Sequence, residues 1–187
     1  MRRSVWLEAG LFATLVALGV VGRLIEHWPN FTPMVAIGLF AGIWLPSRLA
    51  AVAVPLTTML VADWVIGADV WPVTLTVYAA LLVPVLLGGL LARGRSWPAW
   101  GACAVGSSLL FFLVTNFAVW AFLDLYSKSA GGLIACYVAA WPFFKYMLAG
   151  DLFYVGLLGS LHALAARVGI WLSGRKRPEV AYEVAKR

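Results

Sequence analysis

The sequence predicts an all-α polytopic membrane protein with six transmembrane helices. Of its 187 residues, 63% are hydrophobic and only 12% are charged, and the mean hydropathy is +0.92. Soluble domains carry about 25% charged residues, so this composition excludes them. Apolar runs recur along the whole length and are separated by short polar turns. We therefore expect a single six-helix transmembrane domain, residues 1–172, followed by a basic cytoplasmic tail, residues 173–187.

Three expected spans lie in the first third of the chain. The run from about Val5 to Gly22 follows a basic N-terminus but lacks a signal-peptide cleavage site, so we interpret it as the first span. Met34 to Leu45 is short, about 18 Å as a helix, and can cross only with its flanks or by tilting. The third run, Leu49 to Ala62, stops at Asp63 and Trp64.

Three further spans are expected in the rest of the chain. The fourth runs from about Pro72 to Ala92 and the fifth from about Ala99 to Leu123. Leu133 to Trp141 is too short to cross a bilayer alone, so we expect a re-entrant or interfacial piece there. It leads into the sixth helix, about Pro142 to Leu172.

Basic residues predict the orientation of these spans. Six spans place both termini on one side, and with the termini inside only Arg23, Lys128 and Lys145 of the 14 lysines and arginines fall outside. This asymmetry follows the positive-inside rule and predicts cytoplasmic termini. The net charge of +6 is then explained by topology and by contact with the lipid bilayer, so we expect no nucleic-acid partner.

Polar residues at membrane depth indicate a binding site. An unpaired amide in hydrocarbon costs about 2–7 kcal/mol, so such groups must face a cavity, water or other helices. In the predicted orientation they open inward from an outer bowl of aromatic and hydrogen-bonding residues, which suits a bulky, partly polar ligand. The residues that we expect to contact this ligand are Asn30, Phe31, Asp63, Trp64, Tyr78, Asn116, Tyr126, Lys128, Tyr146 and Asp151.

Several of these residues also have a purely structural interpretation. Asn116 can bridge two helices, and Asp151 can pair with Lys145. His27 lies beside Glu26 but has no second His or Cys at ligand spacing, so we interpret it as an interfacial side chain rather than a metal ligand.

Motifs for catalysis are missing from the sequence. It contains no Ser-His-Asp constellation, no HExxH and no Walker A motif. We therefore expect a protein that is not an enzyme and has no catalytic residues, no metal and no intrinsic cofactor.

Small residues recur at four-residue spacing in the first span. Ala9, Ala13 and Ala17 form a stripe on which another helix can approach closely. The stripe is expected to pack either within this chain or against a partner helix.

Short motifs along the chain resemble a known family. They are Asn30-Phe31-Thr32-Pro33, Thr115-Asn116-Phe117, Tyr126-x-Lys128, Cys136-Tyr137, Pro142-Phe143-Phe144 and Gly150-Asp151-Leu152-Phe153-Tyr154. They resemble motifs of the solitary S-component-like cobalamin (vitamin B12) transporters, which are related to the substrate-binding S-components of energy-coupling factor (ECF) transporters. The resemblance implies an S-component-like fold in a bacterial cytoplasmic (inner) membrane, uptake of cobalamin as bound substrate, and either an energising ECF module or no protein partner.

The sequence departs from that family at Ala80. The resemblance implies a cobalt-ligating cysteine in the fourth helix, facing the corrin, at the position that Ala80 occupies. A methyl group cannot ligate cobalt. Either the corrin is bound here without a protein ligand, or this is an altered version, or the transported molecule is another vitamin or small molecule. The alternative from another class is a membrane enzyme or assembly factor that uses Asp151, Lys145 and His27 in proton chemistry.

Overall fold

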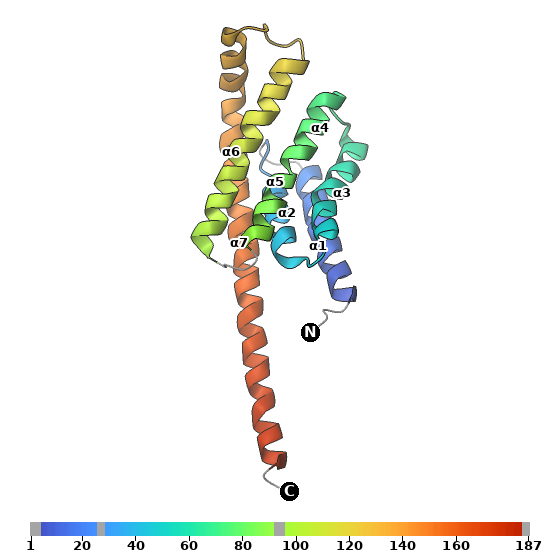
Figure 1. Ribbon diagram of the computed structural model, residues 1–187, viewed down its shortest axis with the longest axis vertical. Coiled ribbons are helices and arrows are strands. Elements are labelled where there is room, and N and C mark those ends of the chain that lie inside the picture. The colour runs from blue at the N-terminus through green and yellow to red at the C-terminus, as the bar shows by residue number, and fades with distance from the viewer. Residues whose placement is uncertain (1–4, 26–28, 92–95, 185–187) are drawn as a thin grey trace. The chain divides into compact units, whose positions relative to one another are not determined.

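The computed structural model describes residues 5–25, 29–91 and 96–184, with side chains described through Arg167. This part of the chain contains seven α-helices and no strand (Figure 1), which confirms the predicted all-α class. The helices are α1 (Val5–Leu24), α2 (Met34–Trp44), α3 (Arg48–Ile66), α4 (Trp71–Ala80), α5 (Leu82–Leu91), α6 (Trp97–Phe122) and α7 (Ala130–Val184).

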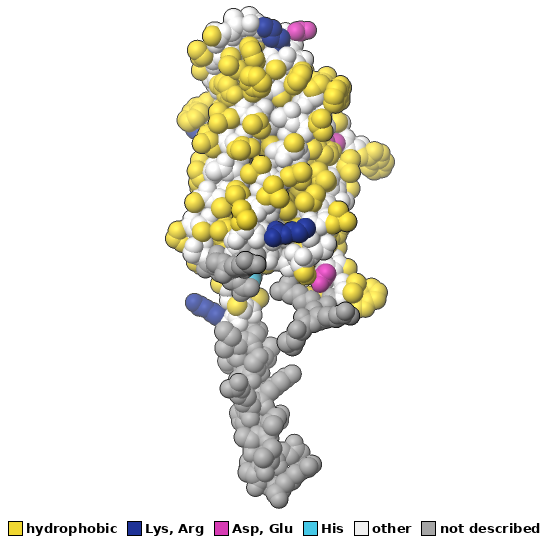
Figure 2. Space-filling view, in the orientation of Figure 1, with side chains coloured by type: hydrophobic (Ala, Val, Ile, Leu, Met, Phe, Trp, Pro, Cys, Tyr) yellow, Lys and Arg dark blue, Asp and Glu magenta, His cyan; other side chains and the backbone are white. Residues whose placement is uncertain are grey.

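The helices are those of a membrane-embedded protein. Five stretches of the described chain are long and apolar enough to cross a bilayer: α1, α3, α4 together with α5, α6, and α7 as far as Arg167. The remaining expected span is the apolar helix α2, whose 11 residues extend only about 16 Å. Figure 2 shows that hydrophobic side chains dominate the described helices on the face in view and that charged side chains are sparse there.

Helix α7 corrects one expectation. Residues 133–141 are not a re-entrant or interfacial piece, because α7 begins at Ala130 and continues through Pro142 without interruption. Helices in membrane proteins tolerate proline when neighbouring groups satisfy the freed backbone carbonyl. The helix reaches Val184, so most of the predicted tail has helical backbone. The chain divides into two compact units, Met1–Val155 and Gly156–Arg187, and the second consists of the remainder of α7.

Helix α2 is the core of the first unit. Nine of its 11 residues are buried, and it contacts α1, α3, α5 and α6. A helix that is apolar on every side needs cover on every side. Its short length is compatible with the membrane because protein covers it.

Glycines bring α2 and α5 into backbone contact. A Cβ added at Gly42 would lie 2.2 Å from the carbonyl oxygen of Val85, and one added at Gly88 would lie 2.0 Å from that of Leu39. Only residues without a side chain allow helices to approach so closely. We call this contact of Gly42 and Gly88 with the facing backbone the glycine interface.

The fourth expected span is divided in two. Leu81 separates α4 from α5, and its backbone N–H still bonds to the carbonyl oxygen of Val77 at 3.1 Å. Pro84 follows within the first turn of α5 and has no N–H to donate. The span therefore has fewer internal hydrogen bonds at its middle than on either side.

Three connections lie at one end of the first unit, because successive spans run in opposite directions. These are the connection between α1 and α2, described over residues 29–33, residues 67–70 between α3 and α4, and residues 123–129 between α6 and α7 (Figure 1). We call this end the cleft end, since the three cavities described below lie towards it.

Candidate functional site

Three cavities adjoin one another towards the cleft end. The largest of the three, the cleft, has a volume of about 610 Å³ and is lined by α1, α3, α4, α6, Asn30 and the connection at residues 67–70. The aromatic chamber, about 140 Å³, lies between α6 and α7. The Asp151 pocket, about 60 Å³, lies beside the start of α2. Asn30 and Phe111 line all three cavities, so the three form one connected candidate site.

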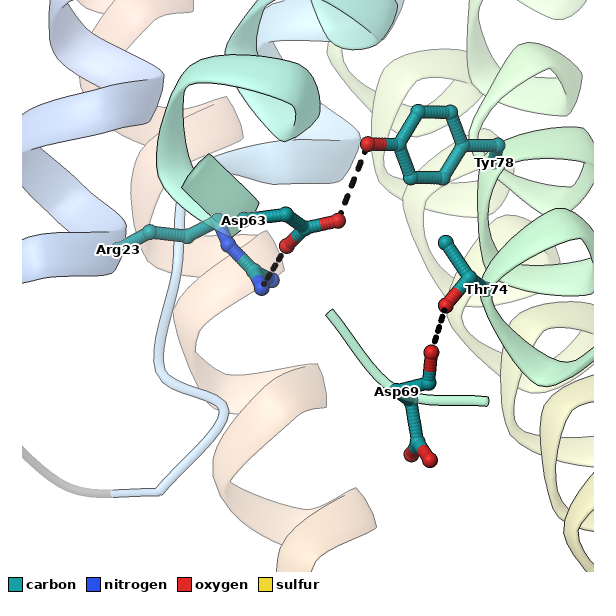
Figure 3. A network of polar contacts seen from close by, with 5 residues as sticks. All are labelled: Arg23, Asp63, Asp69, Thr74 and Tyr78. Carbon is teal, nitrogen blue, oxygen red and sulfur yellow. Dashed lines mark hydrogen bonds and ion pairs between the residues drawn. The ribbon is translucent and has the colours of Figure 1, made fainter. Parts of the chain in front are cut away.

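An ion pair and a hydrogen bond converge on Asp63 in the wall of the cleft (Figure 3). Arg23, in the last turn of α1, places Nη2 3.2 Å from Asp63 Oδ1, and the hydroxyl of Tyr78 donates to Asp63 Oδ2 at 3.0 Å. The side chains of Arg23 and Asp63 are 24% and 11% exposed, so solvent screens their attraction less than that of a surface pair. The cluster ties α1, α3 and α4 together, and it places the predicted residues Asp63 and Tyr78 side by side.

The connection between α3 and α4 is ordered over the cleft by its own hydrogen bonds. The hydroxyl of Thr74 donates to the carbonyl oxygen of Asp69 at 2.9 Å, as Figure 3 shows. The carboxylate of Asp69 accepts from the N–H of Val70 at 2.8 Å. Gly67 adopts φ 89°, which favours glycine, where the chain leaves α3. Asp69 therefore lines the cleft from an ordered turn.

Asp151 supplies the cap that α2 lacks in its own sequence. Pro33 precedes α2 and offers no side-chain cap, which leaves the first N–H groups of the helix without intrahelical acceptors. The carboxylate of Asp151, on α7, accepts from the N–H of Val35 and lies 2.6 Å from the hydroxyl of Ser108. Asp151 is 1% exposed and lines the Asp151 pocket. A carboxylate at a helix N-terminus is stabilised by the helix dipole as well.

Lys145 is not the partner of Asp151. Its side chain is exposed, whereas Asp151 is buried against Ser108 and Val35. The alternative that paired Asp151 with Lys145 was therefore wrong about the partner but right that the carboxylate joins helices.

Two of the motifs that carry the family resemblance pack against each other. A Cβ added at Gly150 would lie 3.1 Å from Phe31 Cα, so the connection before α2 approaches the backbone of α7 closely. The ring of Phe31 lies 5.8 Å from each of the rings of Phe153 and Tyr154. Phe31 therefore anchors this connection and lines none of the three cavities, whereas its neighbour Asn30 lines them all.

The aromatic chamber is built by facing turns of α6 and α7. Phe112 and Phe144 pack with ring centroids 4.7 Å apart, and Phe111 and Phe143 also line the chamber. The predicted residue Asn116 lies in its wall and donates from Nδ2 to the carbonyl oxygen of Phe112 at 2.8 Å. It does not bridge two helices through its side chain in the described part of the chain.

Seven predicted ligand contacts line none of the three cavities, and two of them, Phe31 and Tyr78, are described above. Lys128 donates to the carbonyl oxygens of Trp120 and Leu123 and so caps the end of α6. The others are Trp64, which is 87% exposed, Tyr146, which is 40% exposed, Tyr126, which is half-buried beside Lys128, and Ala80, which is buried at the end of α4.

The small-residue stripe of α1 faces away from the first unit. Ala9, Ala13 and Ala17 are all exposed, whereas the helix buries Leu15 and its C-terminal glycines. Packing within the described part of the chain therefore does not use the stripe, and contact with a partner helix stays a prediction. The other sequence candidate, His27, lies outside the described residues.

Arg23 and Phe111 are among the site residues that sequence reasoning missed, as is Asp69. Arg23 was interpreted only as an outer positive charge, yet it lines two of the cavities, and Phe111 lines all three. One signal could have identified Arg23: it ends the first expected span and Asp63 ends the third, which places opposite charges at the same depth.

Comparison with known proteins identifies the family to which the chain belongs. A sequence model described as a family of unknown function, DUF6580, matches residues 4–172, so the chain belongs to that family. No curated protein and no solved structure matches the chain.

Proposed function

We propose that this member of the DUF6580 family is a membrane transport protein that binds a partly polar organic molecule in the cleft and mediates its uptake. The observation that carries the proposal is the cleft itself. Its volume of about 610 Å³ lies within the range of about 300–1,000 Å³ typical of small-molecule sites. It has a mixed wall of charged, hydroxyl, amide and aromatic groups and lies towards one end of a membrane-embedded unit.

The polar groups of the site are already ion-paired or hydrogen-bonded within the protein, and this favours ligand binding over catalysis. Asp63 is paired with Arg23, and Asp151 accepts from Val35 while lying against Ser108. These contacts join α1 to α3 and hold α2 and α6 against α7, so the polar groups are engaged in positioning helices. The rival interpretation, a membrane enzyme that uses Asp151 with Lys145, requires two side chains that are not in contact.

Cobalamin is the first candidate for the bound molecule, on the strength of the resemblance in the motifs around Asn30 and Asp151. The corrin ring is larger than a drug-sized ligand, so the cleft would hold one edge of the ring and its amide side chains. Because Ala80 is buried and lines none of the three cavities, cobalt would have no protein ligand at that position. Another vitamin of smaller size would fit inside the cleft entirely.

The direction of transport follows from the predicted topology. With six spans and cytoplasmic termini, the cleft end faces outside and receives its ligand there. The connection at residues 29–33 is fixed to α7 through Gly150 and Asp151, whereas residues 67–70 are held by local hydrogen bonds. Residues 67–70 and α4 are therefore expected to make most of the movement that closes the cleft over the ligand. The domain then reorients in the membrane.

Retention of cobalamin on gel filtration tests the proposal. The detergent-purified full chain is incubated with cobalamin, and the visible absorbance that coelutes with protein is compared with that of two tryptophan variants. Val119→Trp fills the cleft from α6, and Val138→Trp adds the same bulk to an exposed position on α7 that lines none of the cavities. We expect near-stoichiometric retention by the wild type and Val138→Trp, and at least tenfold less by Val119→Trp.

Three results would contradict the proposal in different ways. No colour on well-folded wild type would remove cobalamin as the ligand. Equal retention by Val119→Trp would place the ligand outside the cleft. Binding without accumulation of radiolabelled cobalamin in reconstituted vesicles, with and without a membrane potential and ATP-driven components, would leave a binding protein rather than a transporter.

A further inference from the structure

We infer that the cleft selects an organic cation with N–H donors, such as a protonated amine, over neutral and anionic molecules of the same size. The inference deepens the proposed function and rests on its premise that the cleft is the binding site. Three separate features support it: the charges in the wall, the hydrogen-bonding state of the polar groups, and the aromatic chamber.

The wall of the cleft carries more carboxylates than cations. Arg23 is the one basic residue among those that line the cleft, and Asp63 and Asp69 are the acidic ones. The guanidinium of Arg23 is already paired with Asp63. In the described part of the chain Asp69 makes no ion pair, so its charge is available to a ligand in the cleft. A positively charged ligand is therefore attracted and an anion is repelled.

Two hydroxyl groups in the wall of the cleft have already donated their hydrogens. Thr74 donates to the carbonyl oxygen of Asp69, and Thr115 donates to that of Phe111 at 2.7 Å. A hydroxyl has a single hydrogen, so both groups present only lone pairs to the cavities. Together with the carboxylate of Asp69 they make a wall of acceptors, which a ligand rich in N–H donors satisfies.

Arg23 and Asn30 line the cleft and can donate to an acceptor on the ligand. Arg23 Nε is buried without a hydrogen-bond partner in the described part of the chain. Asn30 lies where the three cavities meet, and its amide can donate as well as accept. The ligand that fits these groups is a cation that also carries a hydroxyl or carbonyl oxygen.

The aromatic chamber favours the same charge by a different mechanism. Phe111, Phe112, Phe143 and Phe144 line it from two helices, and the face of an aromatic ring attracts a cation. The oxygens of Thr115 and Asn116 lie in the same wall. Its volume of about 140 Å³ accommodates a small head group rather than a whole molecule.

An anionic ligand is the alternative, with Arg23 as its receptor. Such a ligand would have to displace Asp63 from the guanidinium. Asp63 is 11% exposed and is also held by the hydroxyl of Tyr78, so displacement would leave a partly buried carboxylate without its counter-charge. The existing pair therefore disfavours the anion.

A matched set of ring compounds tests the charge preference. The probes are 2-phenylethylamine, 2-phenylethanol and 3-phenylpropanoate, which share the ring and differ in charge. Thermal unfolding of the detergent-purified full chain is followed by tryptophan fluorescence as each probe is titrated, because a ligand of the native state raises the unfolding midpoint. We expect the amine to bind at least tenfold more tightly than the alcohol and the carboxylate. Equal or tighter binding of either, or no shift with any of the three, would overturn the inference.

Two asparagine variants separate the cleft from the general charge of the protein. Asp69→Asn removes one charge but keeps an oxygen for the N–H of Val70. Asp124→Asn removes a fully exposed carboxylate that lines none of the cavities. Asp69→Asn is expected to weaken amine binding about threefold to tenfold, less at high salt, without changing alcohol binding. Asp124→Asn should match the wild type, and equal losses in both variants would overturn the assignment to the cleft.

The cobalamin and amine experiments can fail independently. Retention of cobalamin without a preference for the amine would leave the proposed transport function in place and remove the cation selectivity. Selective binding of the amine without retention of cobalamin would leave a cation site in the cleft and remove cobalamin as its ligand.

Discussion

Helix α2 is packed tightly at the glycine interface and borders cavities at the cleft end. At Gly42 and Gly88 the helix meets α5 backbone to backbone, with no room for a single methyl group. At its start the same helix is capped by Asp151 and borders cavities that hold polar side chains. Contact without side chains gives one rigid pair of helices, and that rigidity allows cavities to persist a few turns away. The following predictions test this contrast, from the largest expected effect to the smallest.

Gly88→Ala should be the most damaging small substitution. The new Cβ would lie 2.0 Å from the carbonyl oxygen of Leu39, and a backbone atom cannot move aside as a side chain can. Overpacking costs about 1–3 kcal/mol when side chains can adjust, so we expect a loss of at least about 3 kcal/mol. Gly101→Ala on α6 is the matched control, because its Cβ would meet nothing within 4 Å. Thermal unfolding by circular dichroism measures both, and similar losses would contradict the backbone contact.

Asp151→Ala should destabilise the junction between α2 and α7. It leaves the N–H of Val35 without its acceptor, and an unsatisfied buried group costs about 1–3 kcal/mol, whereas the hydroxyl of Ser108 still donates to the carbonyl oxygen of Ala104 at 2.8 Å. We expect a loss of about 1–3 kcal/mol in the free energy of unfolding. Asp151→Asn keeps one oxygen and should lose less than half as much. Hydrogen exchange at Val35 should accelerate in Asp151→Ala, and an unchanged rate would show that Asp151 does not cap α2.

Tyr78→Phe should weaken the contact between α3 and α4 in the wall of the cleft. The variant loses one hydrogen bond to the carboxylate of Asp63 and keeps the ring. The bond is partly buried, so we expect a loss of about 1–2 kcal/mol. Tyr126→Phe is the control, since the hydroxyl of Tyr126 lines no cavity of the site, and it should change stability by less than about 0.5 kcal/mol. Denaturation with chemical denaturant in detergent measures the difference, and equal stability of the two variants would remove the role of the Tyr78 hydroxyl.

Lys128→Met should have the smallest effect. It removes the cation that caps the carbonyl groups at the end of α6 and so costs about 0.5–1 kcal/mol. Cobalamin retention and amine binding should be unchanged, because Lys128 lines none of the three cavities. A loss of binding as large as that in Val119→Trp would restore Lys128 as a ligand contact.

The sequence predicted the depth of each residue in the membrane better than its direction around the helix. Helix positions were close to those expected, and Asn30, Asp63 and Asp151 all line the connected site. Their neighbours show the limit: Trp64 is 87% exposed although it follows Asp63 directly. In lipid both the inner and the outer face of a helix are apolar, so hydrophobic periodicity does not indicate which side is buried.

Long-range partners were the other part that sequence could not supply. Asp151 was recognised as unusual, but its acceptor role depends on Val35 and Ser108, which lie far away along the chain. Lys145 was the nearest opposite charge in sequence and proved to be the wrong partner. The continuity of α7 was missed for a related reason, because Pro142 ends helices in water more often than in a protein that packs around it.

The division of the fourth span at Leu81 separates a helix that is fixed to α2 from a helix that lines the cleft. On one side of the division, α5 is fixed to α2 by the glycine interface. On the other side, α4 carries Val73, Thr74 and Val77 in the wall of the cleft. With fewer hydrogen bonds at its middle, the span bends there at the least cost. We therefore expect α4 to tilt about Leu81 when the cleft changes width, while α5 stays fixed to α2.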